Sequence, residues 1–312
     1  MPTHSPSQAD AHPALGSIWR LGDHRLACGD STDPVLVRVL MGGEEAAMVF
    51  MDPPYGIAYR RHGGRSVPMA GDSLGQEALR RLVAGSLSAA PLRPGGAFYI
   101  CASPGPAQLA FRLAIEDSGL RLRQGLVWVK NHFTLGGHDY PMRHESILYG
   151  CRDGGPRYFA GGRAQHSVWD CPRPDRSPLH PTMKPVGLVL RAVMNSSRPG
   201  EIVYDGFGGS GTTLIACERG GRRCRMVEID PGYCAAVIGR WQAETGRTAE
   251  RIGCPRLFER RRVKKAARHG SARQGLDRPA SLLEGGGHGA YGSGQVAVLP
   301  GVEHAPRGVG QA

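Results

Sequence analysis

The sequence of 312 residues lacks any apolar run long enough to cross a membrane, and it has no Cys-x-x-Cys pair. A transmembrane helix needs about 18 or more consecutive apolar residues, so no membrane span is predicted. The eight cysteines are scattered without histidines at metal-binding spacing, which argues against a zinc site or a disulfide framework. Residues 1–14 lack the charged-then-apolar layout of a signal peptide, so we expect a cytoplasmic protein without a metal ion.

Lysine is also scarce, and the basic charge is unevenly placed. Only 4 of the 39 basic residues are lysines, a bias that we attribute to genomic base composition rather than to function. Residues 251–273 hold nine Arg or Lys against Glu259, a net charge of +8 within the chain's total of +12. Such a segment raises DNA affinity by counterion release, although basic ends are also common as solvated tails.

The same composition divides the chain into three parts. The sequence after the basic segment is rich in glycine and too poor in apolar side chains to offset the entropy cost of ordering. We therefore expect a disordered N-terminus over 1–14, a folded domain over 15–262 and a basic, then glycine-rich, disordered tail over 263–312.

Within the folded part, short apolar runs alternate with helical patterns, which is typical of a mainly parallel sheet with helices on both faces. Seven strands are predicted, at 24–28, 47–51, 97–101, 122–129, 146–149, 202–205 and 225–229. Helices are predicted from Thr32 or Asp33 onward and at 77–90, 105–118, 186–197, 211–219 and 233–244. In such sheets, ligands bind beyond the C-terminal ends of the strands.

A glycine-rich turn over residues 205–213 connects one of these strands to a helix. Its glycines remove side-chain bulk and the helix that follows presents free N–H groups, so the backbone can approach a ligand closely. No Walker lysine follows the turn, which disfavours a P-loop. Glu228 and Asp230 end the next strand, where a carboxylate can hold the ribose hydroxyls of a nucleotide-type ligand.

Two strings of the sequence together resemble those of DNA amino-methyltransferases. Asp205-Gly206-Phe207-Gly208-Gly209-Ser210-Gly211-Thr212-Thr213 resembles their S-adenosylmethionine loop, and Asp52-Pro53-Pro54-Tyr55 resembles the tetrapeptide that holds the amino group of a flipped base. Because the tetrapeptide comes first, the chain resembles the permuted, beta class, and the similarity extends from Leu21 to about Thr245. The resemblance implies a Rossmann-like, seven-stranded α/β fold, S-adenosylmethionine as cofactor, double-stranded DNA as partner and a homodimer as one possible assembly.

The resemblance also implies which residues bind the cofactor. His180-Pro181-Thr182-Met183-Lys184-Pro185 is similar to a string that lies near the methionine end of the cofactor, Glu228 matches the ribose acid better than Asp230 does, and Asp30 resembles the acid near the adenine. The full predicted set is Asp30, Thr182, Lys184, Asp205, Phe207, Gly208, Gly209, Ser210, Gly211, Thr212, Glu228 and Asp230. Gly206 stands where the family has proline and loosens the loop, so Gly206→Pro is expected to tighten cofactor binding.

The catalytic residues are predicted from the chemistry of an exocyclic amino group. Its nitrogen is a poor nucleophile because the lone pair is delocalised into the ring. The Asp52 carboxylate and the Pro53 carbonyl can accept both N–H bonds and stabilise the positive charge that develops during attack on the methyl group. Pro53 and Pro54 stiffen the segment, and Tyr55 offers a face on which the flipped base can stack.

Target recognition is expected between about 131 and 179, where arginines can contact guanine edges or phosphates. The DNA-binding candidates are Arg143, Arg163, Arg173 and Arg176, with Arg60 and Arg61 in a loop after the tetrapeptide.

Aspartate at position 52 favours adenine N6 as the acceptor, and cytosine N4 is the alternative. A protein glutamine amide is a third acceptor with the same chemistry, but the order of the two strings disfavours it. An inactive DNA-binding remnant that depends on the basic tail is the remaining alternative. No nuclease motif is visible in the sequence, so a solitary methyltransferase is expected by analogy.

Overall fold

The computed structural model describes residues 12–56, 74–134, 139–172 and 183–253. All of them belong to a compact unit that ends at Arg262, while residues 263–312 form a second unit outside the described ranges. The predicted tail and most of the predicted N-terminal segment thus lie outside the described residues. Within the described ranges, no helix combines the length and apolarity needed to span a membrane. In the same ranges, no group of three or more His, Cys, Asp or Glu could hold a metal ion.

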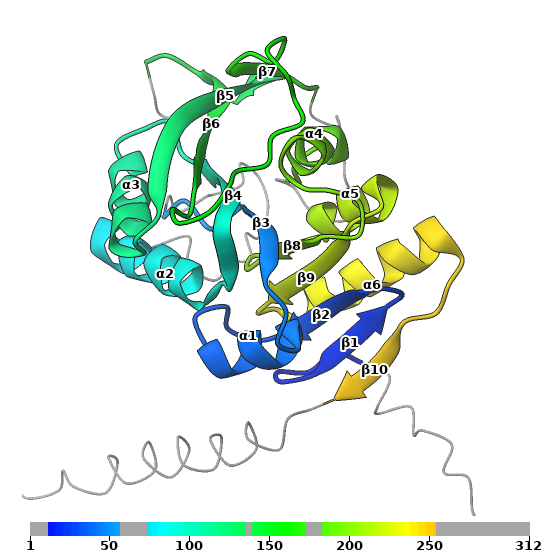
Figure 1. Ribbon diagram of the computed structural model, residues 1–312. Coiled ribbons are helices and arrows are strands. Elements are labelled where there is room, and N and C mark those ends of the chain that lie inside the picture. The colour runs from blue at the N-terminus through cyan, green and yellow to red at the C-terminus, as the bar shows by residue number, and fades with distance from the viewer. Residues whose placement is uncertain (1–11, 57–73, 135–138, 173–182, 254–312) are drawn as a thin grey trace, which may run out of the picture. The chain divides into compact units, whose positions relative to one another are not determined.

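The strands form one ten-stranded sheet in the order β10-β1-β2-β9-β8-β3-β4-β6-β5-β7 (Figure 1). The five central strands, from β2 to β4 in this order, are mutually parallel, and β1, β6 and β10 add antiparallel pairs. The strands are β1 Ile18–Leu21, β2 His24–Cys28, β3 Ala46–Met51, β4 Leu92–Ala102, β5 Arg121–Thr134, β6 Met142–Cys151, β7 Val168–Asp170, β8 Ile202–Asp205, β9 Arg223–Glu228 and β10 Glu250–Gly253.

The α/β fold with a mainly parallel centre agrees with the sequence prediction, but the predicted count of seven strands is wrong. Each predicted strand overlaps one of the observed ten, and β1, β7 and β10 were missed. These three strands have only three or four residues, and β7 and β10 are largely exposed. Strands of three or four residues are too short for the continuous apolar run that identified the other strands.

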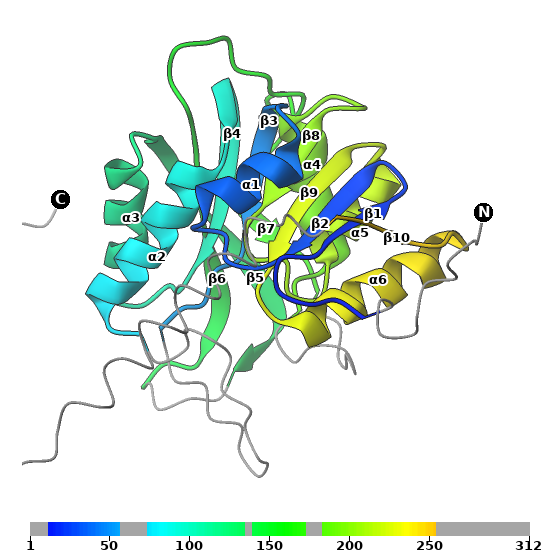
Figure 2. The same ribbon diagram turned by 90° about the horizontal axis from the view of Figure 1, so that it is seen from below.

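Six helices cover the two faces of the sheet within the described residues. One apolar core holds side chains of α4, α5 and α6, and the other holds side chains of α1, α2 and α3. Figure 2 shows α2 and α3 on one side of the strands and α6 on the other. The helices are α1 Pro34–Met41, α2 Gln76–Ala89, α3 Gln108–Asp117, α4 Val186–Ser196, α5 Thr212–Gly220 and α6 Pro231–Thr245.

Strand β3 illustrates why the central strands read as continuous apolar runs. Met48 and Phe50 point into one core, whereas Val49 and Met51 point into the other. A parallel strand covered on both faces has no solvated side, so its sequence does not alternate between apolar and polar residues.

The register of the parallel strands brings distant residues to one edge. Cys28 pairs with Glu228, Asp205 with Met226, and Val49 with Tyr204. The C-terminal ends of β2, β9, β8 and β3 are therefore neighbours, and the acidic residues predicted at those ends share one edge of the sheet.

Candidate active site

Asp52, which follows β3, forms an ion pair with the buried Lys184. The Lys184 ammonium lies 2.7 Å from each carboxylate oxygen of Asp52. The Lys184 side chain is only 6% exposed, and it comes from the segment just before α4. Two residues that the sequence assigned to different functions, catalysis and cofactor binding, are thus in direct contact.

Glu145 of β6 extends this pair into a buried ion cluster, which we define as Asp52, Lys184, Glu145 and Lys130. Glu145 Oε2 lies 3.1 Å from the Lys184 ammonium, and Glu145 Oε1 lies 2.7 Å from the Lys130 ammonium. The Tyr55 hydroxyl lies 2.8 Å from Glu145 Oε2 and 3.2 Å from Asp52 Oδ1. Tyr55 therefore links the two carboxylates of the cluster.

Opposite charges keep Glu145 and Lys184 of the ion cluster ionised. Burial disfavours the Glu145 carboxylate, but the ammonium groups of Lys184 and Lys130 outweigh it and lower the Glu145 pKa to about 2. Burial likewise disfavours the Lys184 ammonium, yet Asp52 and Glu145 raise the Lys184 pKa above its ordinary value. Each buried ion is compensated by opposite charge, as a group removed from water requires.

Aromatic rings surround the ion cluster. The ammonium of Lys184 lies 5.3 Å from the ring centre of Tyr55 and 5.9 Å from that of Trp128. Phe111 packs edge-on against Tyr55, with ring centroids 6.0 Å apart. The Trp128 indole N–H donates to the Cys171 carbonyl at 2.7 Å, which fixes the indole ring.

The glycine-rich turn follows β8, the strand next to β3 in the sheet. Asp205 Oδ1 accepts the Phe207 N–H at 2.9 Å, and Gly208 N–H donates to the Val227 carbonyl at 2.9 Å. A Cβ at Gly208 would lie 2.6 Å from Met226 Cγ, and Gly211 has a φ of +83°. Both positions require glycine, the first because of space and the second because of backbone conformation.

Glu228 lies under this turn at the end of β9. One of its oxygens accepts the Gly209 N–H at 2.7 Å, and the other accepts the Asp230 N–H at 2.8 Å. The backbone N–H of Ile229 also contributes to this carboxylate, which still has a lone pair for a hydroxyl donor. Asp230 has a structural task, since its Oδ1 accepts the Gly232 and Tyr233 N–H groups and caps α6.

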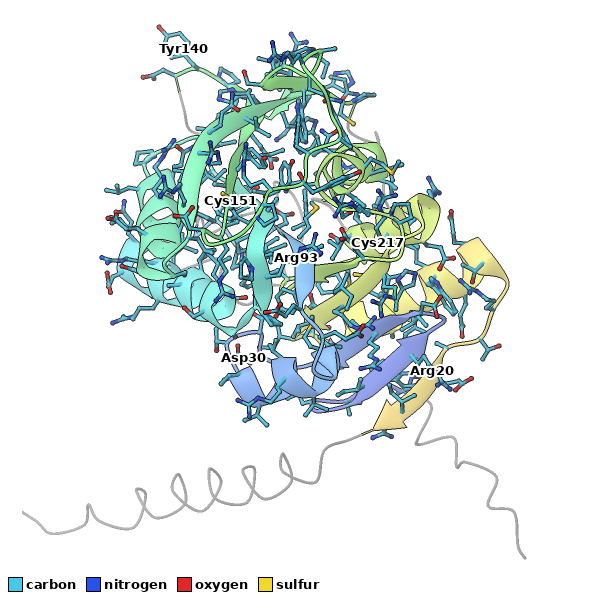
Figure 3. All side chains as sticks on the ribbon, in the orientation of Figure 1. Arg20, Asp30, Arg93, Tyr140, Cys151 and Cys217 are labelled. Atoms are coloured by element: carbon cyan, nitrogen blue, oxygen red, sulfur yellow. The ribbon has the colours of Figure 1, made fainter. Side chains whose placement is uncertain are left out.

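Asp30 follows the neighbouring strand β2 and is exposed (Figure 3). Its Oδ1 accepts hydrogen bonds from the Thr32 backbone N–H and hydroxyl, both at 2.8 Å. Gly29 N–H donates to the Glu228 carbonyl at 2.8 Å, which ties the two strand ends together. Asp30 and Glu228 therefore lie on adjacent strand ends.

Lys184 also connects the ion cluster to the glycine-rich turn. Its carbonyl accepts the Thr212 hydroxyl at 3.3 Å. Arg240 of α6 donates to the Ser210 carbonyl at 3.0 Å and to the Thr212 hydroxyl at 3.3 Å. Arg240 was not identified from the sequence, because nothing in a mid-helix arginine indicates that it supports a loop some 30 residues earlier.

The segment predicted for target recognition contributes β6 and β7 to the sheet and carries exposed side chains at its ends. Tyr140 is 88% exposed and extends away from the fold (Figure 3). Arg143 donates to the Lys130 carbonyl at 3.0 Å, and Arg163 is exposed. The remaining predicted residues lie outside the described ranges: Arg60, Arg61, Arg173, Arg176 and Thr182.

Residues 46–239 match the model of the N6_N4_Mtase family, described as DNA methylase. This range is more than half of the chain, and it contains β3, the glycine-rich turn and the whole ion cluster. The chain belongs to this DNA methylase family.

Curated relatives match part of the chain's length. The chain is 28% identical over 151 residues to the type II methyltransferase M.Cfr9I of Citrobacter freundii, covering 45% of this chain and 50% of the relative. It is 32% identical over 112 residues to the DNA adenine methyltransferase YhdJ of Escherichia coli K12, covering 35% of this chain and 38% of the relative. The chain thus spans about half or less of the curated relatives that it matches.

Solved structures match the DNA methylase fold. The complex of M1.HpyAVI with SAM has a TM-score of 0.51 at 20% identity, covering 69% of this chain and 98% of that one. The cytosine-N4-specific PvuII DNA methyltransferase has a TM-score of 0.54 at 18% identity, covering 68% and 84%. Because these identities are low, the two structures show only that the fold is shared.

Asp205 makes the stability of the protein depend on pH. Burial raises the Asp205 pKa to about 7, although hydrogen bonds from Thr213 and Phe207 favour the carboxylate. The folded state thus binds this proton more tightly than the unfolded state. Protonated Asp205 therefore stabilises the fold fully below about pH 4, and this contribution is lost as pH rises through 7. Asparagine cannot ionise. Asp205→Asn is therefore expected to match the wild-type melting temperature near pH 4 and to exceed it by several degrees at pH 8.

Thermal melts of both proteins across this pH range test the effect of Asp205. A difference between the two melting temperatures that does not change with pH would contradict a raised Asp205 pKa.

The structure changes the expectation for Gly206→Pro. A Cβ at Gly206 would lie 2.6 Å from Ser86 Oγ and 3.2 Å from Ser31 Cβ, so the loop has no free space there. Overpacking of this kind costs about 1 to 3 kcal/mol, more than the stabilisation expected from a stiffer loop. Gly206→Pro is therefore expected to lower the melting temperature. Adding Ser86→Ala is expected to restore much of the loss, and chemical denaturation of the single and double variants measures both effects.

If the changes in the free energy of unfolding from Gly206→Pro and Ser86→Ala simply add in the double variant, Ser86 does not obstruct the proline ring.

Proposed function

We propose that the protein transfers a methyl group from S-adenosylmethionine to the N6 amino group of a flipped adenine in DNA. The observation that carries this proposal is the adjacency of β3 and β8, which are parallel neighbours in the sheet. Asp52 follows the first strand and the glycine-rich turn follows the second. A methyl donor on the turn and an amino group on Asp52 would therefore meet at one edge of the sheet.

The residues around the glycine-rich turn fit the cofactor. Gly209 has open space where a side chain would lie, and Glu228 and Asp30 offer acceptors for hydroxyl and amino groups. The cofactor, when bound, supplies an electrophilic methyl group on a sulfonium. M1.HpyAVI, whose structure was solved with SAM, has the same fold and supports this assignment. Thr182 and Lys184 are proposed to lie toward the methionine end.

The tetrapeptide would prepare the amino nitrogen for attack. The Asp52 carboxylate and the Pro53 carbonyl accept its two N–H bonds, which localises the lone pair and stabilises the positive charge on nitrogen. Tyr55 orients the base by stacking. A bound cofactor would supply the methyl group, while Asp52 and Pro53 would hold the amino nitrogen that accepts it and releases one proton to solvent.

Adenine is proposed over cytosine because Asp52 opens the tetrapeptide, and the name of the relative YhdJ supports this choice. The segment from 131 to 179 is proposed to contact the DNA target, with Arg143 and Arg163 among its described arginines. Residues 15–262 are proposed as the methyltransferase domain.

A labelling experiment tests the proposal. The protein is incubated with unmethylated DNA and isotopically labelled S-adenosylmethionine, and the nucleosides are analysed by mass spectrometry. We expect label in N6-methyladenine, whereas label in N4-methylcytosine would keep the mechanism and overturn the base assignment. No label in either base would overturn the proposed function.

The same assay tests the function of Asp52. Asp52→Asn keeps the shape of the side chain but removes its charge, so we expect a loss of about 100-fold or more in kcat. Asp153→Asn is the matched control, because Asp153 is a surface residue in an exposed pair with Arg121. Equal activity of Asp52→Asn and the control would contradict the proposed catalytic function of Asp52.

A further inference from the structure

We propose that Glu145 is a positioning residue that receives the Lys184 ammonium when the target amino group takes its place on Asp52. This inference rests on the proposed function and names a residue that the tetrapeptide and the cofactor loop do not contain. It starts from the observation that the acceptor oxygens of Asp52 already bind another donor.

Lys184 competes directly with a target amino group for Asp52. Its ammonium is equidistant from the two carboxylate oxygens at 2.7 Å, and the Tyr55 hydroxyl lies 3.2 Å from one of them. A carboxylate can accept several hydrogen bonds, but a buried cation beside it repels positive charge on a nearby nitrogen. Asp52 can stabilise the reacting nitrogen fully only if Lys184 moves away.

A buried ammonium cannot leave one anion without meeting another. Removing its only partner would leave an uncompensated buried charge, which is strongly destabilising. Glu145 Oε2 lies 3.1 Å from the Lys184 ammonium, so a small movement of the side-chain end completes the transfer. Glu145 is thus the second carboxylate that such a movement requires.

The remaining contacts of Glu145 keep it in place to receive Lys184. Lys130 holds Glu145 Oε1 at 2.7 Å, and the Tyr55 hydroxyl lies 2.8 Å from Oε2. The side chains of Glu145 and Lys130 are 14% and 8% exposed, so water competes little for these bonds. The low pKa of Glu145 keeps it an anion throughout the range in which the enzyme would act.

Glu145 could instead serve only as a structural counter-ion to two buried lysines. The two explanations predict different combinations of melting temperature and kcat in the variants. Glu145→Gln leaves two ammonium groups with one carboxylate, so both explanations expect a lower melting temperature. Lys130→Met in the same chain removes the surplus charge and rebalances the ion cluster as Asp52 with Lys184. Stability then returns under both explanations, but Lys184 still has no second carboxylate.

The experiment compares wild type, Lys130→Met, Glu145→Gln, Glu145→Asp and the double variant Lys130→Met/Glu145→Gln. The measurements are melting temperature, kcat and KM for DNA, and the affinity for S-adenosylmethionine by calorimetry. We expect the double variant to regain most of the melting temperature while its kcat stays at least about tenfold below that of Lys130→Met. Cofactor affinity is expected to stay within about twofold, and Glu145→Asp to recover part of kcat because it keeps the charge.

Glu116→Gln is the matched control, since Glu116 is an exposed carboxylate on α3, and its kinetics are expected to equal those of wild type. If kcat returns together with the melting temperature in the double variant, Glu145 is only structural and the proposal fails. It also fails if Glu145→Gln keeps full kcat, or if neither Gln variant folds, because stability then accounts for Glu145. Absence of methyl transfer by wild type would instead overturn the proposed function itself.

Discussion

The pairing of two buried ammonium groups with two partly buried carboxylates is the constraint on which the site depends. These four residues come from the end of β3, from β5 and β6, and from the segment before α4. Removing Lys184 or Glu145 leaves one of the other ions without a partner, and such a change costs more than an ordinary surface substitution. The ion cluster therefore fixes the position of Asp52 relative to elements that lie far from it in the sequence.

The parallel register supplies the rest of the geometry. Adjacent strands β2, β9, β8 and β3 end at one edge, so a carboxylate placed after each strand needs no further element to reach its neighbours. The glycines after β8 let the backbone turn there without steric conflict, and Glu228 holds that turn through the Gly209 N–H. Lys184 then joins the two halves, because its side chain binds Asp52 and its carbonyl accepts a bond from Thr212.

What the sequence predicts well is what local patterns encode. The central strands, the helix that Asp33 caps before Pro34, and the positions of Asp52 and the glycine-rich turn all follow from apolar runs and turn residues. Glu145 and Lys130 could not be found in this way. They are diagonal neighbours on the long β5–β6 pair, toward the end where the two strands are connected, and there Trp128 is opposite Glu145 and Val129 opposite His144. Only that cross-strand register, which no single segment specifies, brings them to Tyr55 and Lys184.

One signal for the two buried lysines of the site was nevertheless present in the composition. Base composition explains why only 4 of 39 basic residues are lysines, but not why Lys130 and Lys184 are both buried in one site. An arginine has a planar fork of donors that favours one fixed bidentate geometry, whereas a lysine carries a compact charge on a flexible stem. A cation that bridges two carboxylates, at 2.7 Å from one and 3.1 Å from the other, needs the second kind of side chain. At position 184 of this arginine-rich chain, lysine therefore supplies the compact charge that fits between Asp52 and Glu145.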